Sequence, residues 1–330
     1  MTDPVVAPAD PATALQEAQA LRQAVVAELG KVIVGQAEVV ELLLTALVCG
    51  GHVLLEGVPG VAKTLMVRAL ARCVEARFGR IQFTPDLMPA DILGTSVFDV
   101  KSTTFALVKG PIFTDLLLAD EINRAPAKTQ SALLEAMQER SISLEGQVHV
   151  LGPLFTVFAT QNPIESEGTY PLPEAQLDRF LFKIEVGYPK PEEEDRILAA
   201  VHAGLDSSDL AGAGVSAVVR PAQLLAARRA TAGVQVEPSV LGYLRRIVSA
   251  TRDSPRIRLG AGPRAGIHLL VAAKTRAALA GRPFVTPDDL RALVPAVLRH
   301  RLLLAPEAEL DGVTVAEALD EVLGQVEVPR

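Results

Sequence analysis

The sequence predicts an α/β fold, with a three-layer αβα core around a mostly parallel sheet and an all-helical domain after it. Through about residue 188, short apolar runs typical of buried strands alternate with longer segments of helical periodicity. A glycine-rich turn joins one of these strands to a helix, and beyond residue 190 only helical patterns recur. We therefore expect a disordered Pro/Ala-rich leader over residues 1–11, a core over 12–189 and a helical domain over 190–330.

The elements of the core can be assigned in order along the chain. Helical periodicity covers residues 12–30, 38–49, 64–72, 86–93 and 127–140. Strand patterns cover residues 52–56, 80–84, 115–119, 155–159 and 181–186, and hairpin patterns lie within 95–113 and 141–150. Strands that alternate with helices in this way favour parallel pairing, because each crossover returns the chain to the same end of the sheet.

The second half of the chain shows no strand pattern. Helices are expected over residues 192–203, 221–232, 238–252, 263–280, 286–304 and 315–326, several with proline in the first turn. A stretch rich in Gly, Ser and Ala, residues 206–219, separates the first of these helices from the rest and is expected to be a linker.

Composition and charge limit the possible partners. The 330 residues are 49% hydrophobic with a mean hydropathy of +0.29, which supplies ample core material. Residues 1–190 carry 15 basic and 22 acidic side chains, whereas residues 191–330 carry 17 of each. Neither half has the basic excess of a nucleic-acid surface, and aromatic residues make up only 4% of the chain. Nucleic acid is therefore an unexpected partner.

Targeting and redox features point to a soluble cytoplasmic protein. The first ten residues lack the basic start and apolar core of a signal peptide. The longest apolar region, residues 42–55, contains Gly50-Gly51 and is too short to span a bilayer. Two cysteines, Cys49 and Cys73, are too few for a disulfide framework and are expected to be buried free thiols.

The glycine-rich turn has the pattern of a phosphate-binding loop. It reads Gly57-Val58-Pro59-Gly60-Val61-Ala62-Lys63-Thr64, and Leu65 continues into the predicted helix. Backbone N–H groups of such a turn converge on an anion, and the helix directs its positive end to the same point. Lys63 would lie over the β- and γ-phosphates, and the Thr64 hydroxyl would bind Mg²⁺. Ala62 stands where glycine usually precedes the lysine.

Two further polar positions follow buried strands. Asp120 and Glu121 end the run Leu116–Ala119, which places them at the carboxyl edge of a parallel sheet, where α/β proteins bind ligands. Asp120 can hold Mg²⁺ through its water shell, and Glu121 can polarise the water that attacks a γ-phosphate. Asn162 follows the next buried strand and could hold that water or touch the phosphate. The two acids could instead be ordinary solvated side chains at a strand end, but Asp120 follows Lys63 by 57 residues, one strand farther along, which disfavours that alternative. Asn162 alone would be a turn-forming residue and gains weight only from the loop and the acids.

Two arginines are candidates for charge stabilisation in the transition state. Arg179 precedes the strand expected at residues 181–186 and could reach the γ-phosphate bound by a neighbouring subunit, or it could form a surface ion pair. Arg264 lies in the first turn of the helix expected at 263–280, where the helix dipole disfavours a cation. An anionic partner such as a nucleotide phosphate would explain that position, although ordinary exposure would also tolerate it.

Together these motifs resemble the AAA+ ATPases, and more narrowly the MoxR family of the helix-2-insert clade. The resemblance rests on Val34-Gly35-Gln36, Gly57–Thr64, Asp120–Ala125, Ala159–Pro163, Pro173–Phe180 and Gly260–Ala265, in order over nearly the whole chain. Alanine before the loop lysine is common in this family, so Ala62 fits the resemblance.

The resemblance implies a P-loop NTPase core with a helical lid, and it implies roles for particular residues. Val34 and Gly35 would lie near the adenine, Asp120 and Glu121 would form the Walker B pair, Asn162 would be sensor 1, Arg179 the trans-acting finger and Arg264 sensor 2. The two hairpins resemble the helix-2 and pre-sensor-1 inserts, which tend to line a pore or contact clients, although decoration of the sheet edge is the simpler alternative.

The implied function is hydrolysis of ATP with Mg²⁺ by a chaperone-like homo-oligomer, a hexameric ring, that remodels or matures client proteins with von Willebrand factor A domains. Two alternatives remain open from the sequence. One is a DNA-dependent or magnesium-chelatase-like motor, which the shortage of basic and aromatic residues disfavours. The other is a nucleotide-dependent binding switch with little turnover, which intact Glu121 and Asn162 disfavour.

Overall fold

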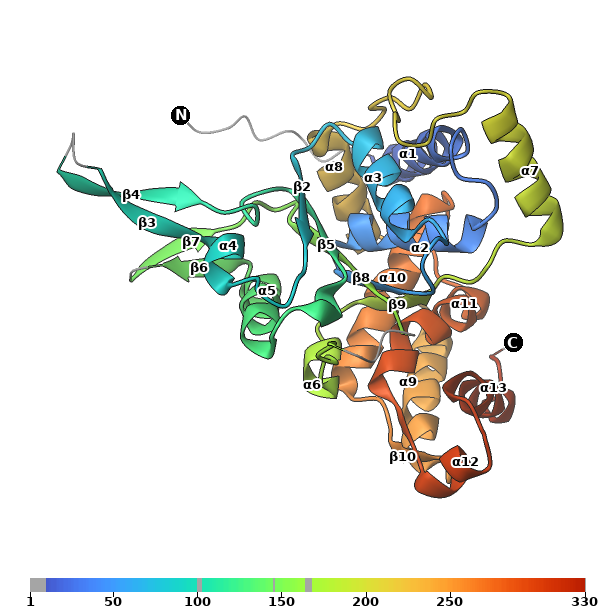
Figure 1. Ribbon diagram of the computed structural model, residues 1–330. Coiled ribbons are helices and arrows are strands. Elements are labelled where there is room, and N and C mark those ends of the chain that lie inside the picture. Colours follow the sequence, from blue (N-terminus) through green and yellow to red (C-terminus); the bar gives the residue numbers. More distant parts are fainter. Residues whose placement is uncertain (1–9, 100–102, 145, 164–167, 330) are drawn as a thin grey trace.

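A computed structural model describes residues 10–99, 103–144, 146–163 and 168–329. At its centre lies a five-stranded sheet with the order β2-β5-β8-β1-β9, in which all neighbouring strands run parallel (Figure 1). The strands are β1 (Val53–Glu56), β2 (Phe78–Gln82), β5 (Leu116–Asp120), β8 (Thr156–Gln161) and β9 (Phe182–Glu185). Because all five run the same way, the residues that follow them meet at one edge of the sheet.

Helices cover both faces of this sheet. In the first half they are α1 (Pro11–Leu29), α2 (Ala37–Cys49), α3 (Lys63–Cys73), α4 (Pro89–Leu93), α5 (Ala127–Glu139) and α6 (Glu174–Leu177), with a 3₁₀ turn η1 (Ile122–Arg124). The expected leader of residues 1–11 lies almost wholly outside the described residues, and α1 begins within its last two positions, at Pro11.

Alternating side chains of the strands enter two separate apolar clusters. Leu55 packs with α1, α2 and α3, whereas its neighbour Leu54 packs with α5 on the other face. Leu116 and Leu117 divide in the same way. The period of two follows from the pleat of a strand. The expectation of a three-layer αβα core is confirmed.

Two antiparallel hairpins extend from the core on the same side of the molecule (Figure 1). They are formed by β3 (Gly94–Asp99) with β4 (Thr104–Lys109) and by β6 (Ser141–Leu144) with β7 (Gln147–Val150). Both expected hairpins are confirmed, although residues 100–102 of the first connection and residue 145 of the second lie outside the described residues.

The second half of the chain is mainly helical. Its helices are α7 (Pro191–His202), α8 (Pro221–Ala232), α9 (Pro238–Asp253), α10 (Pro263–Leu279), α11 (Pro287–Leu298), α12 (Pro306–Leu310) and α13 (Val315–Gln325). All but α13 have proline in the first turn, where its missing N–H would have no partner in the helix.

Three details of the second half differ from expectation. The helix expected over residues 286–304 ends at Leu298, where a 3₁₀ turn η2 (Arg299–Arg301) leads into the short strand β11 (Leu303–Leu304). This strand pairs with β10 (Ile257–Leu259), so the expected absence of strands was wrong. The helix ends before residue 304 because these residues form strand hydrogen bonds instead. Helix α12 was not predicted.

The apolar cluster on the α1–α3 face continues into the second half without a break. It includes buried residues of α8, α9, α10, α11 and α13, and both α8 and α10 pack against α1 and α2 (Figure 1). The expected linker is also bound to the core, because Leu210, Val215 and Val219 are buried and Val219 forms a parallel bridge with Val74. Within the described residues, no helix has both the length and the apolar character that crossing a membrane would require.

Candidate functional site

A cavity of about 480 Å³ lies at the carboxyl edge of the sheet. Its walls include residues 59–65 of the glycine-rich loop, Asp120 and Glu121 at the end of β5, and Asn162 after β8. Parallel pairing of β5, β8 and β1 is what gathers these three segments. The structure thus brings together most of the residues that the sequence predicted for one site.

The loop has backbone conformations suited to a close approach by an anion. Gly60 and Ala62 both have left-handed conformations, with φ of +88° and +62°. At Gly57 a Cβ atom would lie 2.4 Å from the Val186 carbonyl oxygen, so only glycine fits there. Helix α3 begins immediately afterwards, at Lys63, and directs its N-terminus at the cavity. The N–H groups at that N-terminus and the positive end of its dipole favour a bound phosphate.

Lys63 and Thr64 line the cavity, where both side chains could contact a bound phosphate or its metal ion. The Lys63 ammonium donates to the carbonyl oxygens of Gly57 and, at 2.9 Å, of Val58. The Thr64 hydroxyl lies 3.2 Å from each carboxylate oxygen of Asp120. The loop and the strand-end acid are therefore in direct contact.

Asp120 is the centre of a small polar network. Its carboxylate accepts a hydrogen bond from the Thr160 hydroxyl at 2.6 Å and pairs with the Arg80 guanidinium at 2.7 Å. Asp120 is buried, and the charge and donors around it compensate for the loss of water.

Glu121 is oriented by three neighbours. Its carboxylate accepts from the Gln82 amide at 2.9 Å and from the Arg124 guanidinium at 3.0 Å. Its backbone N–H donates to the Thr160 hydroxyl, and its φ of +56° is left-handed, which is rare for a residue with a side chain. A strained backbone with side-chain support holds the carboxylate at the mouth of the cavity.

Asn162 is buried next to this pair of acids. It lines the cavity, and its backbone carbonyl accepts from the Asn123 amide at 3.4 Å. Val34 and Gly35 do not line the cavity. The next residue, Gln36, donates to the Gly187 carbonyl at 3.0 Å, directly after Val186, which packs on Gly57.

Arg179 and Arg264 lie at the opposite, amino-terminal edge of the sheet, where the strands begin. They line a separate cavity of about 250 Å³ together with Gly50, Gly51 and His52. Those three residues precede β1, whereas the glycine-rich loop follows it, so the two cavities lie at opposite ends of the same strand. Four residues of strand span about 13 Å. Within one chain, the two arginines do not contribute to the cavity at the glycine-rich loop.

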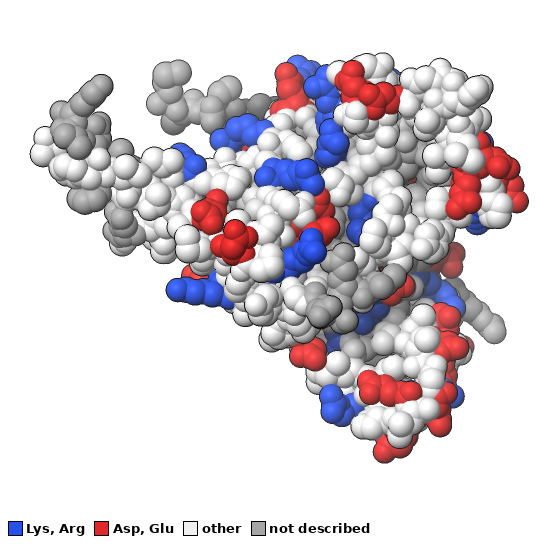
Figure 2. Space-filling view, viewed as in Figure 1, with Lys and Arg blue, Asp and Glu red and all other residues white. Residues whose placement is uncertain are grey.

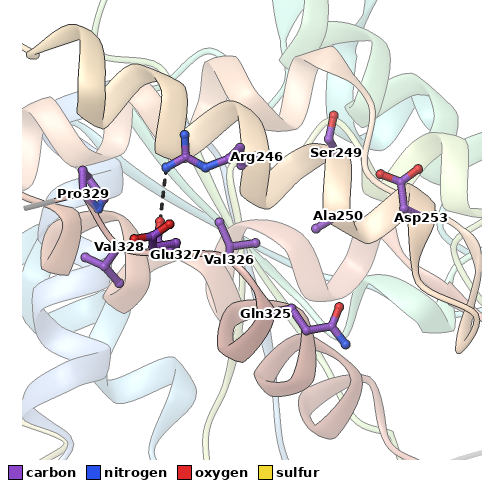
Figure 3. Close-up of a pocket in the computed structure, with 9 residues that line it drawn as sticks. All are labelled: Arg246, Ser249, Ala250, Asp253, Gln325, Val326, Glu327, Val328 and Pro329. Carbon is purple, nitrogen blue, oxygen red and sulfur yellow. Dashed lines mark hydrogen bonds between the residues drawn. The ribbon is translucent and has the colours of Figure 1, made fainter.

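A larger hollow elsewhere has a different character. It has a volume of about 670 Å³ and lies between α9 and the tail after α13, where Arg246 donates to the Glu327 carbonyl at 3.1 Å (Figure 3). None of the residues predicted for function lines it.

In Figure 2, Lys and Arg side chains gather over the region of β2 and α3, whereas Asp and Glu side chains gather over α7. Arg68 of α3 and Arg80 of β2 line the cavity at the glycine-rich loop, where an anion is expected.

Sequence reasoning missed several residues of the first cavity, above all Arg80, Gln82 and Thr160. Arg80 and Gln82 are two residues apart in β2, so their side chains lie on the same face of the sheet. Gln82 is directly opposite Asp120 in the register of β2 and β5. This pairing could not be read from the sequence. Thr160 did have a signal, because it is the polar residue between the apolar residues 157–159 and Gln161-Asn162.

The oxygen donors of Thr64 and Asp120 fit a nucleoside triphosphate with Mg²⁺. A threonine hydroxyl and a carboxylate are hard oxygen donors, and two protein donors leave the other Mg²⁺ positions for phosphate oxygens and water. Among the residues that the structure describes, no group of three or more His, Cys, Asp or Glu could hold a metal ion by itself. The cavity therefore suits a metal that arrives with a phosphate.

Two domain families match this chain, one over the α/β core and one over the helical second half. The family described as "ATPase family associated with various cellular activities (AAA)" matches residues 52–182, and an AAA lid domain matches residues 249–322. A crystal structure of a Cytophaga hutchinsonii protein superposes with a TM-score of 0.86 at 38% identity, covering 96% of this chain and 98% of that one. The fold is an AAA+ P-loop core with a helical lid.

Relatives narrow the class. Chaperone MoxR1 of Mycobacterium tuberculosis is 45% identical, over 92% of this chain and 81% of the relative. Protein MoxR of Paracoccus denitrificans is 33% identical, over 92% and 95%. An uncharacterized Bacillus subtilis protein, YeaC, is 45% identical over 92% and 93%. The chain belongs to the MoxR family of AAA+ ATPases.

Proposed function

We propose that this chain hydrolyses ATP with Mg²⁺ at a site shared between two copies, and that hydrolysis drives remodelling of client proteins. The observation that carries the proposal is the separation of the predicted site into two edges of one sheet. One edge holds the loop, Asp120, Glu121 and Asn162, and the opposite edge holds Arg179 and Arg264.

At the loop edge, each residue has a distinct task. Lys63 would exchange its bonds to loop carbonyls for bonds to the β- and γ-phosphate oxygens. Thr64 and Asp120 would hold Mg²⁺, whose charge offsets that of the phosphates when it is bound. Glu121 would accept a proton from the attacking water while Gln82 and Arg124 keep its carboxylate oriented. Asn162 would hold that water or the γ-phosphate.

The second edge would complete the site of a neighbour. Charge that develops on the γ-phosphate requires a cation close to it, and a subunit that presents Arg179 and Arg264 can supply one. A contact between unlike edges is heterologous, so repetition closes into a ring when the rotation permits. The family resemblance suggests a hexamer.

The client is proposed from the relatives and from the surface of the two hairpins. One 45% identical relative carries the name Chaperone MoxR1. The two hairpins expose apolar side chains, including Val97, Val148 and Val150, which suits contact with another polypeptide. We propose that they contact clients with von Willebrand factor A domains.

Steady-state ATPase measurements test the proposal with three variants. Glu121→Gln should bind ATP but lose turnover by at least about 100-fold, because glutamine cannot accept the proton. Lys63→Ala should lose binding, and Arg179→Ala should lose turnover with little change in affinity. Normal turnover in Glu121→Gln would refute the catalytic assignment. A specific activity that does not fall on dilution to monomer would refute the shared site.

A pull-down with Glu121→Gln tests the client, because a chain that holds ATP without hydrolysing it should retain the bound protein. Purified von Willebrand factor A domains should be retained with ATP and released without it. ATPase activity stimulated by DNA, with a steep loss on added salt, would instead support a DNA-dependent motor.

A further inference from the structure

Asp178 joins two arginines that come from different parts of the chain. It follows α6 and precedes Arg179 directly. One carboxylate oxygen accepts from the Arg264 guanidinium at 3.0 Å, and the other accepts from Arg301 Nε at 2.8 Å. The Arg264 side chain is 49% exposed, whereas that of Arg301 is 3% exposed. The carboxylate therefore connects an arginine at the surface to one in the interior.

Arg301 also binds the backbone on both sides of Arg179. Its Nη2 donates to the Asp178 carbonyl at 3.1 Å and to the Phe180 carbonyl at 2.6 Å, and its Nη1 lies 3.4 Å from the Leu181 carbonyl. The planar guanidinium presents several donors in a fixed geometry, which suits such a bracket. The backbone of Arg179 is thereby fixed at each end by one side chain.

The same guanidinium reaches the two lid helices that flank this segment. Arg301 donates to the Val297 carbonyl of α11, and its Nη2 lies 2.7 Å from Nδ1 of His268 on α10, one turn beyond Arg264. The segment before β9, helix α10 and the end of α11 thus share one hydrogen-bond network. Within the described residues, Asp178 is the carboxylate that compensates the buried Arg301 charge. Loss of that carboxylate would leave a buried cation without an anion.

We propose that Asp178 and Arg301 are positioning residues, which hold Arg179 and Arg264 in a fixed relation at the edge opposite the glycine-rich loop. The inference rests on the proposed function, in which those two arginines act on the nucleotide of a neighbouring copy. An exposed arginine samples many rotamers, and an ion pair to a fixed carboxylate restricts them. Fixing both cations before they meet a phosphate removes part of the ordering cost from the chemical step.

The test compares Asp178→Asn with a matched control, Asp289→Asn. Asparagine keeps the shape of Asp178 and an oxygen for Arg301, but it loses the charge that holds Arg264. Asp289 likewise joins two arginines of the lid, Arg282 and Arg276, and lies outside both cavities. Asp178→Asn should lower kcat on the order of 10- to 100-fold with KM for ATP changed less than about twofold. Asp289→Asn should lose stability but keep kcat.

A second variant and a mixing experiment separate positioning from folding. Arg301→Lys keeps the charge but loses the planar fork that binds the Asp178 carboxylate and both carbonyls together, so a folded Arg301→Lys chain should show the same loss of kcat. Asp178→Asn retains an intact loop, and Lys63→Ala retains intact arginines. Mixed assemblies of the two should therefore recover activity above the sum of the separate chains.

The outcomes distinguish the two proposals. A wild-type chain without ATPase activity would overturn both. An active wild-type chain whose kcat is unchanged by Asp178→Asn would overturn the positioning role alone. The same conclusion would follow if Arg179→Ala and Lys63→Ala chains recovered activity on mixing but Asp178→Asn and Lys63→Ala chains did not, because the effect of Asp178 would then be confined to its own chain.

Discussion

Thr160 links the two acids of the candidate site through a single hydroxyl. That hydroxyl donates to the Asp120 carboxylate at 2.6 Å and accepts from the Glu121 N–H at 2.9 Å. Thr160 is 1% exposed, so its hydroxyl forms both bonds away from bulk water. The hydroxyl thereby fixes the orientation of one carboxylate and the unusual backbone of the other.

Replacing Thr160 with valine should weaken both stability and turnover. The substitution conserves shape but leaves a part-buried N–H and a carboxylate oxygen without that partner, which costs about 1–3 kcal/mol. Turnover should fall about tenfold or more, because Asp120 and Glu121 lose a shared support. Urea unfolding and steady-state ATPase assays measure the two effects.

Thr156→Val on the same strand is the control. Thr156 is also buried, and its hydroxyl donates to the Leu154 carbonyl at the far end of β8. It should lose stability and keep kcat. Equal kcat values for the two valine variants would show that Thr160 has no role in the site beyond packing.

At this scale the sequence was informative where neighbours in the chain carry the chemistry. Lys63 and Thr64 follow their glycines directly, and Asp120 and Glu121 end a recognisable apolar run. Arg80 and Gln82 were missed because their contact with the acids depends on which strand pairs with β5. Strand order is a property of the whole sheet and leaves no local pattern.

At the scale of elements, His52 joins three parts of the core. It lies immediately before β1, accepts at Nδ1 from the Val157 N–H of β8 at 2.9 Å, and has Nε2 3.1 Å from the Met137 carbonyl of α5. The neutral ring, protonated at Nε2, satisfies both contacts. Burial is the main cause that lowers the pKa of His52 to about 3, and the nearby Arg140 charge adds to it.

Stability should therefore fall as the pH drops below about 6.5. The unfolded chain binds a proton at His52 near pH 6.5, whereas the folded chain binds it only near pH 3. Between these values the unfolded state carries more protons, so His52 contributes stability above pH 6.5 that is lost as the pH decreases. The loss is about 1.4 kcal/mol per pH unit for one histidine.

His52→Gln provides the test, since glutamine can accept and donate but does not titrate. Urea unfolding at pH 7 and pH 5 should show that the wild type loses about 2 kcal/mol more than the variant. Other titrating groups, including His268 and His300, occur in both chains and cancel in the comparison. Equal losses would mean that His52 is not held neutral by the fold.

The elements also show where periodicity stops being informative. Residues 286–304 are apolar at helical spacing throughout, yet the helix ends at Leu298. Residues 299–301 instead form η2, and Leu303–Leu304 pair with β10. In η2 the Arg301 side chain contacts the segment before β9. Its partner Phe180 lies 121 residues earlier in the chain. Tertiary contacts override helical preference here.

For the whole molecule, the shared apolar cluster is the most consequential feature. The boundary expected at residues 189 and 190 remains a prediction, and the cluster runs across it from α1–α3 to α8–α11. Arg228 of α8 also donates to the carbonyls of Leu47 and Val48 at the end of α2. Each half covers apolar surface of the other.

The full chain should therefore unfold in one cooperative transition. Separating the halves would expose buried side chains of α1 and α2, and hydrophobic burial is the main term that stabilises folding. Scanning calorimetry should give a calorimetric enthalpy equal to the van't Hoff enthalpy, and a fragment of residues 10–189 should aggregate. Two resolved transitions, or a folded fragment, would instead establish independent domains.

The placement of the loop and the arginines at opposite edges has a numerical consequence for assemblies. In an open row of copies joined edge to edge, one terminal copy has a loop without arginines and the other has arginines without a loop. On the proposed function, a row of n copies contains n − 1 complete sites, and only closure supplies the last one. Activity per copy would then rise with the length of the row and reach its maximum when the two ends meet.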